Sequence, residues 1–553
     1  MSQKTRWRLA PALGALIIAA QIGAFAAWCL ARDPGAAHDD ANLLLWAVDL
    51  EAWLRAGAPG PLPANVRGAP YPPLVPLAAA LAFWIADARS VGLACAAVAP
   101  WMALLSGVSG WVVGVARGPA AGLAACAVAP MALWSLGHPG SFHADLPLAC
   151  AIAATALAGW RMAARPGVGG VGGVVGVAAL GSVALLTKWT AALFLLPLVG
   201  LGLLGSGRLR VAAAASLALA ACAPWYLPEL PRILTFARDN LAGDYTGEAA
   251  GLALAAPFYP SRLVTGVLGA PALALALLGA TSPRPGPHRA AALSLLLGAA
   301  LLTLQPYRDQ RYLLAGLGLL APILVEGGLR LSRRWAPPLL VAVGLLHAST
   351  ALDPARTPWP DPERWAAPLL EDRDGLRRSG LRRARRDLLH PVVRLRGPVA
   401  DALGPAPPPL RKAARALHRA APPGPLTVHV VDTVGRSVLE RLKVELALER
   451  GPGVQVSRSP LREAEVTRRL REGRVGAWRA PPALADRAWV VESLDPATLP
   501  DARPAWAALR AEGRAVAARG GGLAGERPAV VQIWGPPGWR GAARTHPEVS
   551  PRP

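Results

Sequence analysis

Long apolar stretches separated by short polar or basic loops repeat along the first 350 residues of this 553-residue chain. Most of them approach 20 residues, the length at which a helix crosses the hydrocarbon core of a bilayer. The residue-by-residue alternation typical of membrane barrels is absent from the sequence. We therefore predict a polytopic α-helical membrane protein. Its eleven expected spans are 9–31, 91–116, 119–137, 145–163, 171–187, 189–206, 210–227, 262–281, 289–305, 312–329 and 336–350.

A shorter apolar stretch at 71–86 decides the orientation of these spans. If it crossed the membrane, the arginines of the later short loops would face outward, against the excess of basic residues in cytoplasmic loops. If it lies on the outer surface as a juxtamembrane helix, those arginines are cytoplasmic. They are Arg117, Arg161, Arg165, Arg208, Arg210, Arg284, Arg289, Arg330, Arg333 and Arg334. We adopt the second interpretation, with a cytoplasmic N-terminus in the cell (inner) membrane and outer loops at 32–90, 138–145, 228–261 and 305–311.

The first span follows Lys4, Arg6 and Arg8, as a signal peptide would. No convincing small-residue cleavage site comes after it, so we expect an uncleaved first helix. Residues 1–350 then form the transmembrane domain, which includes the first outer loop at 32–90.

The remainder of the chain has a different pattern. Residues 351–424 are rich in Arg and Pro and predict a linker, and 541–553 predict a disordered tail. Between them, 425–540 predict a small extracytoplasmic α/β domain with strands at 426–431, 488–491 and 529–534 and a helix at 438–448.

Composition changes this picture little. The chain is 53% hydrophobic, with a mean hydropathy of +0.34. In a soluble protein the net charge of +23 would indicate nucleic acid as a partner, but Arg-rich usage and basic cytoplasmic loops account for it here, so no nucleic acid is expected. All five cysteines lie in or beside the apolar stretches, which leaves the C-terminal domain without a disulfide.

Three aspartates are the candidate catalytic residues. Asp39 and Asp40 follow the first span, and Asp145 opens the fourth. Each could simply cap the helix that follows it. Carboxylates beside hydrocarbon are costly, however, and commonly functional. They could deprotonate a hydroxyl or bind a metal ion, so a divalent metal stays open while no metal site is assigned.

Cations and aromatic residues fall on the same predicted face. Lys188 lies between two apolar runs with almost no loop, and Arg308 and Arg311 precede the tenth span beside Tyr312. These cations suit phosphate oxygens, although Lys188 could instead snorkel to the interface and the Arg-Tyr segment could be an interfacial anchor. Contacts to substrate are expected from Tyr71, His138, His143 and Tyr312. Each histidine alone is better explained as a loop residue than as a metal ligand, because no third ligand has clear spacing.

Six short motifs in order resemble the C-type integral-membrane glycosyltransferases, especially the family 39-like group of protein O-mannosyltransferases and aminoarabinose transferases. They are His38-Asp39-Asp40, Tyr71-Pro-Pro-Leu, Asp145-Leu-Pro-Leu, Leu186-Thr-Lys188, Pro224-Trp-Tyr226 and Arg311-Tyr-Leu-Leu. Asp40 stands where that group more often has Glu.

The resemblance covers about residues 9–350. It implies transfer of a sugar, with inversion, from a polyprenyl-phosphate donor to a lipid, glycan or protein acceptor on the outer face, with Asp39 as the base. A transporter or flippase of lipid-linked glycans is one alternative, and a membrane scaffold whose C-terminal tail binds a partner is another. Transporters carry charges near the bilayer midplane in repeated broken helices, whereas the charges here gather at one face and no repeat is visible, which favours the enzyme.

Overall fold

The computed structural model describes residues 3–32, 39–58, 60–67, 71–130, 142–164, 170–204, 207–242, 259, 263, 269–303, 310–352, 414–415, 417–421, 426–432, 436–452, 454–458, 489–494, 516–524, 527–534 and 536. The chain forms two compact units. The first comprises Met1–Leu30, Ala64–Val75 and Cys95–Leu403. The second comprises Ala31–Pro63, Pro76–Ala94 and Gly404–Pro553.

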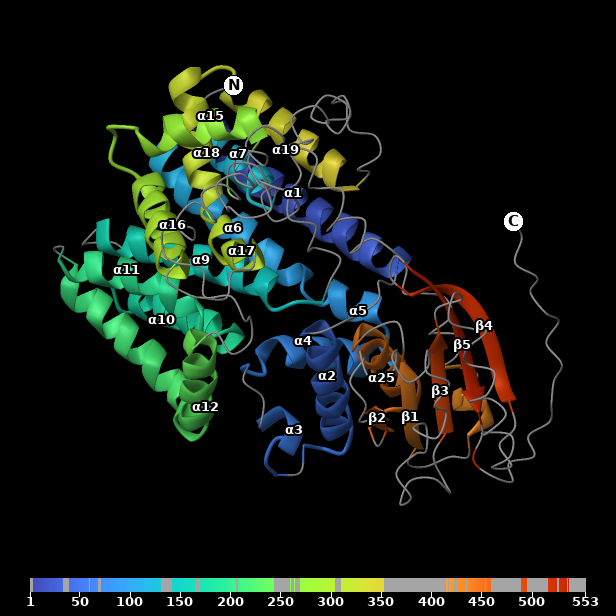
Figure 1. Ribbon diagram of the computed structural model, residues 1–553. Helices are drawn as coiled ribbons and strands as arrows, with labels where there is room; N and C mark the ends of the chain where they lie inside the picture. The colour runs from blue at the N-terminus through green and yellow to red at the C-terminus, as the bar shows by residue number, and fades with distance from the viewer. Residues whose placement is uncertain are drawn as a thin grey trace, which may run out of the picture. The chain divides into compact units, whose positions relative to one another are not determined.

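Helices make up the described part of the first unit (Figure 1). In chain order they are α1 (Gln3–Arg32), α3 (Ala64–Arg67), α6 (Ala99–Arg117), α7 (Pro119–Val128), α9 (Asp145–Ala164), α10 (Gly170–Thr187), α11 (Ala191–Leu203), α12 (Arg208–Ala242), α15 (Gly269–Ala280), α16 (Pro287–Thr303), α17 (Gln310–Leu317), α18 (Leu320–Leu331) and α19 (Ala336–Leu352). Within the described residues, each predicted span contains one or two helices, counting α5 (Val91–Ala96) ahead of α6. The parts of the predicted spans at 131–137 and 264–268 lie outside the described residues.

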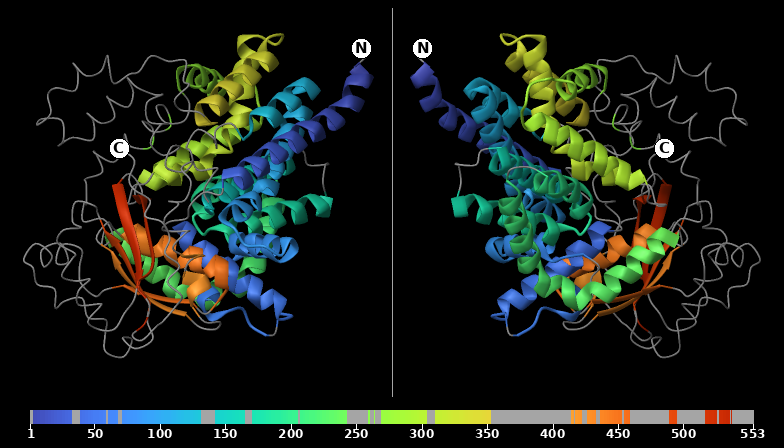
Figure 2. Two further views of the ribbon diagram at one scale, coloured as in Figure 1. Left: turned by 90° about the vertical axis from the view of Figure 1, so that its right-hand side faces the viewer. Right: turned by 90° about the vertical axis from the view of Figure 1, so that its left-hand side faces the viewer.

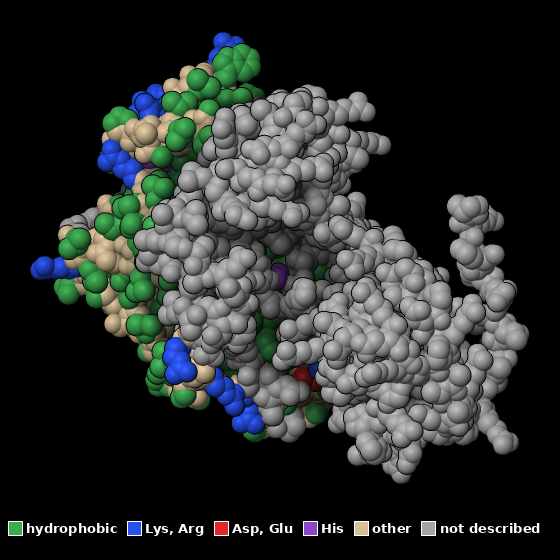
Figure 3. All heavy atoms as spheres, in the orientation of Figure 1, with side chains coloured by type: hydrophobic (Ala, Val, Ile, Leu, Met, Phe, Trp, Pro, Cys, Tyr) green, Lys and Arg blue, Asp and Glu red, His purple; other side chains and the backbone are tan. Residues whose placement is uncertain are grey.

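Five helical stretches are long and apolar enough to cross a bilayer: Leu9–Ala27, Val91–Arg117, Asp145–Ala164, Gly170–Thr187 and Arg208–Thr235. Figure 3 shows hydrophobic side chains spread over the visible surface of the helices, where Lys and Arg stand out at only a few places. Large apolar side chains are exposed along α10, α11 and α12, among them Val171, Leu204 and Leu219. Such a surface suits lipid rather than water. Together with the long apolar helices, it identifies a multi-pass helical membrane protein. The number and direction of its spans stay predictions.

Helix α9 is the centre of the first unit. Every residue from Asp145 to Leu157 is buried, as expected for a helix that is apolar on all sides. α6, α10, α11, α16 and α17 pack around it. Near its C-terminal end, the Arg161 guanidinium lies 3.8 Å from the ring centroid of Trp111 in α6. The C-terminal ends of α6 and α9 therefore lie together, opposite the end that carries Asp145.

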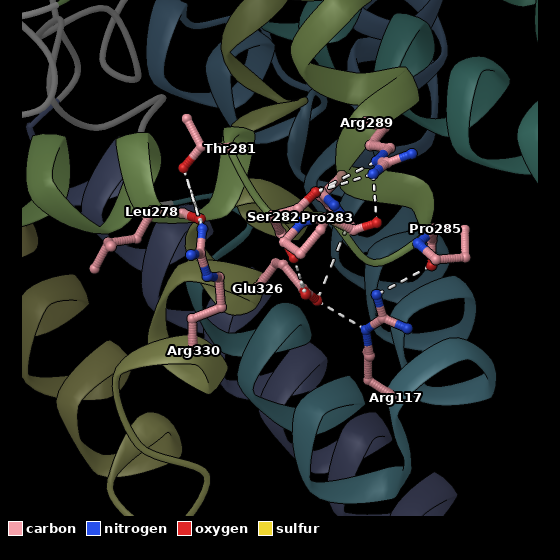
Figure 4. Close-up of polar contacts among 10 residues, drawn as sticks. Arg117, Leu278, Thr281, Ser282, Pro283, Pro285, Arg289, Glu326 and Arg330 are labelled. Atoms are coloured by element: carbon pink, nitrogen blue, oxygen red, sulfur yellow. Dashed lines mark hydrogen bonds and ion pairs between the residues drawn. The ribbon is translucent and has the colours of Figure 1, made fainter.

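A polar cluster ties three segments together at the Arg117 end of the first unit (Figure 4). Glu326 of α18 is buried, and its carboxylate accepts from Arg117 Nε and from Ser282 Oγ, each at 2.7 Å. His288 Nδ1 lies 3.9 Å from the same carboxylate. Because every charge in this cluster has a partner, the buried glutamate is tolerated and joins α6 to α18 and to the α15–α16 connection.

Helices α15 and α18 cross at glycine. A Cβ atom on Gly327 would overlap the carbonyl oxygen of Leu275, and one on Gly279 would overlap that of Ile323. The two backbones are therefore in direct contact, which is how small residues let membrane helices approach closely.

The second unit contains α2 (Asp39–Arg55), most of α4 (Leu74–Ala86), α25 (Arg436–Arg450) and one five-stranded sheet. The strands are β1 (Leu426–Asp432), β2 (Val454–Arg458), β3 (Trp489–Leu494), β4 (Val516–Ala524) and β5 (Arg527–Trp534), in the order β2-β1-β3-β5-β4. β1 pairs in parallel with β2 and β3, and β5 pairs in antiparallel with β3 and β4.

Helix α25 connects the parallel strands β1 and β2, as a crossover between parallel strands requires, and packs on both of them (Figure 2). The predicted helix at 438–448 and the strands at 426–431, 488–491 and 529–534 coincide with α25, β1, β3 and β5. Strands β2 and β4 were not predicted. The expected helix at 71–86 is α4, and its place on the membrane surface stays a prediction.

Candidate functional site

Lys188 lies in a tight junction between two helices. α10 ends at Thr187 and α11 begins at Ala191, and the N–H of Ala191 donates to the carbonyl of Lys188 across the turn. Tyr226 of α12 supports this junction, since its hydroxyl donates to the carbonyl oxygen of Leu185 at 2.5 Å. The sequence identified the short connection correctly, and its packing keeps the Lys188 side chain only 3% exposed.

The ammonium of Lys188 is paired with Asp145. Lys188 Nζ donates to Asp145 Oδ1 at 2.7 Å, and both side chains are 3% exposed. Asp145 belongs to the first turn of α9, where the helix dipole also favours a negative charge. A buried ammonium needs such a partner, because an isolated charge would not be accommodated there. The junction and the start of α9 are thus joined by a buried charge pair.

Two tyrosine rings lie beside the same ammonium. Lys188 Nζ is 5.4 Å from the ring centroid of Tyr71 and 5.3 Å from that of Tyr312. Both distances are within the range of a cation–π contact. Four segments distant in sequence therefore meet at this cation: the segment before α4, the start of α9, the α10–α11 junction and the start of α17.

His143 precedes α9 and lies against Asp145. Its Nδ1 is 2.9 Å from Asp145 Oδ2 and 3.2 Å from the backbone nitrogen of Asp145. A protonated Nδ1 donates to the carboxylate, and an unprotonated Nδ1 accepts from the backbone N–H. In either tautomer the imidazole, itself 8% exposed, fixes the first turn of α9 and the carboxylate that holds Lys188.

The acidic pair Asp39-Asp40 forms the start of α2 in the second unit. Only the backbone of Asp39, Asp40 and Arg311 is described. His138 and Arg308 lie outside the described residues. The structure therefore brings together Asp145, Lys188, His143, Tyr71 and Tyr312 of the predicted set. It also places Asp39 and Asp40 at the start of α2 and Arg311 in the first turn of α17.

No group of three His, Cys, Asp or Glu side chains with a metal-binding arrangement occurs among the described residues. Among the described residues, Asp145 contacts His143 and Lys188, and an ammonium cannot be a metal ligand. The cluster around Lys188 thus combines a buried ion pair, an imidazole and two tyrosine rings.

Two charged clusters escaped the sequence analysis. One is the Arg117–Glu326 pair, and the other joins Glu51 of α2 to Arg55 and Arg89. A glutamate inside an apolar helix, such as Glu326, is itself a usable signal. Its partner could not have been found, because Arg117 is 209 residues away and looked like an ordinary cytoplasmic-loop arginine.

No protein-family model matches the sequence, and no curated protein matches it either. Solved structures do match its fold. The crystal structure of ArnT from Cupriavidus metallidurans in the apo state has a TM-score of 0.55 and 16% identity, over 96% of this chain and 98% of that one. The structure of ArnT from the same organism bound to undecaprenyl phosphate has a TM-score of 0.57 and 16% identity, over 94% and 97%. The resemblance to the aminoarabinose-transferase group is thus confirmed at the level of the fold, and this chain shares the fold of ArnT over nearly its whole length.

Proposed function

We propose that the protein transfers a sugar from a polyprenyl-phosphate donor to an acceptor on the outer face of the cell membrane. The fold supports this assignment, because one of the matching structures is described as bound to undecaprenyl phosphate. A lipid-borne donor also suits a multi-pass membrane protein, which it reaches by diffusing within the bilayer.

The observation that carries the proposal is the environment of Lys188. Its ammonium is buried, fixed at 2.7 Å from Asp145 and flanked by two tyrosines. A compact cation with several donors suits phosphate oxygens. When the donor enters, its phosphate adds a second anion beside Lys188, while Asp145 and His143 keep the lysine in place. We therefore assign Asp145 to holding the phosphate-binding lysine.

The chemistry then requires a base on the acceptor side. In our proposal the Asp39 or Asp40 carboxylate takes the proton of an acceptor hydroxyl, whose oxygen attacks the anomeric carbon from the face opposite the phosphate. The bond between that carbon and the phosphate oxygen breaks, and polyprenyl phosphate leaves with the bonding electrons. Lys188, with Arg308 and Arg311, stabilises the charge that develops on the phosphate. The configuration at the anomeric carbon is inverted.

The proposed topology places this reaction outside the cell. Arg117 and Arg161 lie at the end of the first unit opposite Asp145 and Lys188. If basic ends face the cytoplasm, the Lys188 site faces outward. We retain eleven spans, a cytoplasmic N-terminus and an extracytoplasmic C-terminal sheet domain as parts of the proposal.

Reconstitution tests the proposed function. The purified protein in lipid nanodiscs is given a panel of polyprenyl-phosphate hexoses and pentoses together with membrane extract from cells that lack the gene. We expect release of polyprenyl phosphate with one donor and an inverted linkage in the product. Mass analysis of the glycans and glycolipids lost on deletion identifies the acceptor. Movement of a lipid-linked glycan across vesicles without any transfer would contradict the proposal and favour a flippase.

A further inference from the structure

Helix α2 is anchored by a charge cluster around the buried Glu51, far from the acidic pair that the helix carries. We propose that Glu51 and Arg89, together with α25 of the C-terminal domain, are positioning elements that hold α2 so that Asp39 and Asp40 meet the acceptor. This inference rests on the proposed function only for the role of the acidic pair, since the anchoring of α2 is a property of the second unit itself.

Glu51 is the fixed point of the cluster. Its side chain has no exposed surface, and it lies in the last two turns of α2. One carboxylate oxygen accepts from Arg89 Nε at 3.0 Å and from Arg89 Nη2 at 2.6 Å, and the other pairs with Arg55. Arg55 in turn donates to Asp87 Oδ1 at 2.7 Å. The end of α2 is thus tied to the segment that follows α4, with both oxygens of a buried carboxylate in use.

The C-terminal domain completes this anchor. α2 packs against α25, and Figure 1 shows the two helices side by side. α25 buries Leu442 and Leu446, and α2 buries Leu43, Leu44 and Ala47. Directly after α25, Gly451 has φ +79°, and a Cβ atom there would lie 3.1 Å from Nη1 of Arg89. The turn after α25 therefore fits closely against the arginine that binds Glu51. In this way the C-terminal domain contributes to holding α2 in place.

The distance between anchor and acidic pair explains why anchoring matters. Twelve residues separate Asp39 from Glu51, or about 18 Å at the rise of an α-helix. A tilt of about 5° at the Glu51 end would then move the first turn by about 1.6 Å. A displacement of this size is enough to lower a reaction rate by about 10²-fold. The donor-phosphate residues belong to the first unit, so the loss should fall on kcat rather than on the KM for the donor.

Hydrogen exchange tests the anchor independently of activity. We compare Glu51→Gln, Arg89→Met and the double variant with Arg415→Gln. This control removes an exposed ion pair to Glu449 at the C-terminal end of α25, and such a surface pair contributes little to stability. Each single variant should raise amide exchange of residues 39–55 at least about tenfold, because a stranded charge destabilises its surroundings. The double variant should exchange more slowly than either single one, and Arg415→Gln should match the wild type. Unchanged exchange of 39–55 in both single variants would overturn the proposal.

Kinetics then test the consequence for catalysis. With kcat expressed per donor-binding site, so that only folded molecules count, Glu51→Gln should lower kcat about 10²-fold and leave the donor KM within about twofold. A rise in KM with unchanged kcat would contradict positioning of the acidic pair. If Glu51→Gln does not accumulate in membranes, Glu51→Asp, which keeps the charge on a shorter side chain, takes its place. If the wild type transfers no sugar, the proposed function fails, while hydrogen exchange still decides whether α2 is anchored.

Discussion

Replacing Lys188 with methionine removes its charge while keeping most of its length, and so tests the role of the buried pair. The partners are 2.7 Å apart and 3% exposed, so the small energies typical of surface ion pairs do not apply. Removing one partner of a buried pair typically costs 3–5 kcal/mol, because the other charge is stranded. His143 remains 2.9 Å from Asp145 and offsets part of this cost. We therefore expect Lys188→Met to lower the free energy of unfolding by about 3 kcal/mol.

The same variant should also weaken donor binding. Hydrogen bonds to charged groups contribute about 1.5–3 kcal/mol, so loss of the ammonium should weaken donor binding by about 10- to 150-fold. Asp145→Asn combined with Lys188→Met leaves no stranded charge. The double variant should therefore be more stable than the sum of the single effects predicts, by at least about 2 kcal/mol, yet it should still bind the donor poorly.

Unfolding in mixed micelles and binding of a labelled polyprenyl-phosphate sugar in nanodiscs measure the two effects separately. Arg330→Gln serves as the control, because Arg330 is an exposed donor to the Leu278 carbonyl. Recovery of stability without recovery of binding supports a phosphate-binding lysine held by Asp145. Wild-type donor affinity in the double variant would refute that reasoning and leave Lys188 with a structural role alone.

Three further predictions concern the helical unit. Gly327→Ala should prevent accumulation of folded protein in membranes, measured by fluorescence-detected size exclusion, because its Cβ would overlap the Leu275 carbonyl. Glu326→Gln should lower the free energy of unfolding by about 3 kcal/mol, since Arg117 would lose its buried partner, and a loss below about 1 kcal/mol would contradict the cluster's role. The proposed topology predicts that a cysteine replacing Ser141 reacts with an impermeant thiol reagent outside the cell and that one replacing Arg284 does not. The five native cysteines are buried and should add little background. The reverse labelling would contradict the topology.

The helical unit could be predicted because apolar run length is a local signal. Every expected span contains helix within the described residues, and the tight Lys188 junction was visible as two apolar runs without a loop. The α/β pattern of the C-terminal domain was also readable, since β1, α25, β3 and β5 carry apolar periodicity. Strand β4 was not found, because its Gly-Gly-Gly segment has low strand propensity and is held at the sheet edge by pairing with β5.

The partners within each cluster were harder to predict. The sequence marked Asp145, Lys188, Tyr71 and Tyr312 singly and placed them on one face, yet the direct Lys188–Asp145 pair became evident only from the packing of α9 against the α10–α11 junction. Glu51 and Arg89 gave no signal, because a glutamate is ordinary in a helix that the sequence predicts to lie outside the membrane. Its complete burial results from helix packing that no local pattern encodes.

Sugar transfer by the wild type and by an Asp39→Asn, Asp40→Asn double variant tests the central claim most directly. Both proteins are reconstituted at equal donor-binding capacity, with Arg415→Gln as the matched control in the same unit, and transfer of radiolabelled sugar from its polyprenyl-phosphate donor is followed over time. We predict transfer by the wild type and the control, and a loss of at least about 10²-fold in the double variant. Full transfer by the double variant would contradict the assignment of the acidic pair as the base.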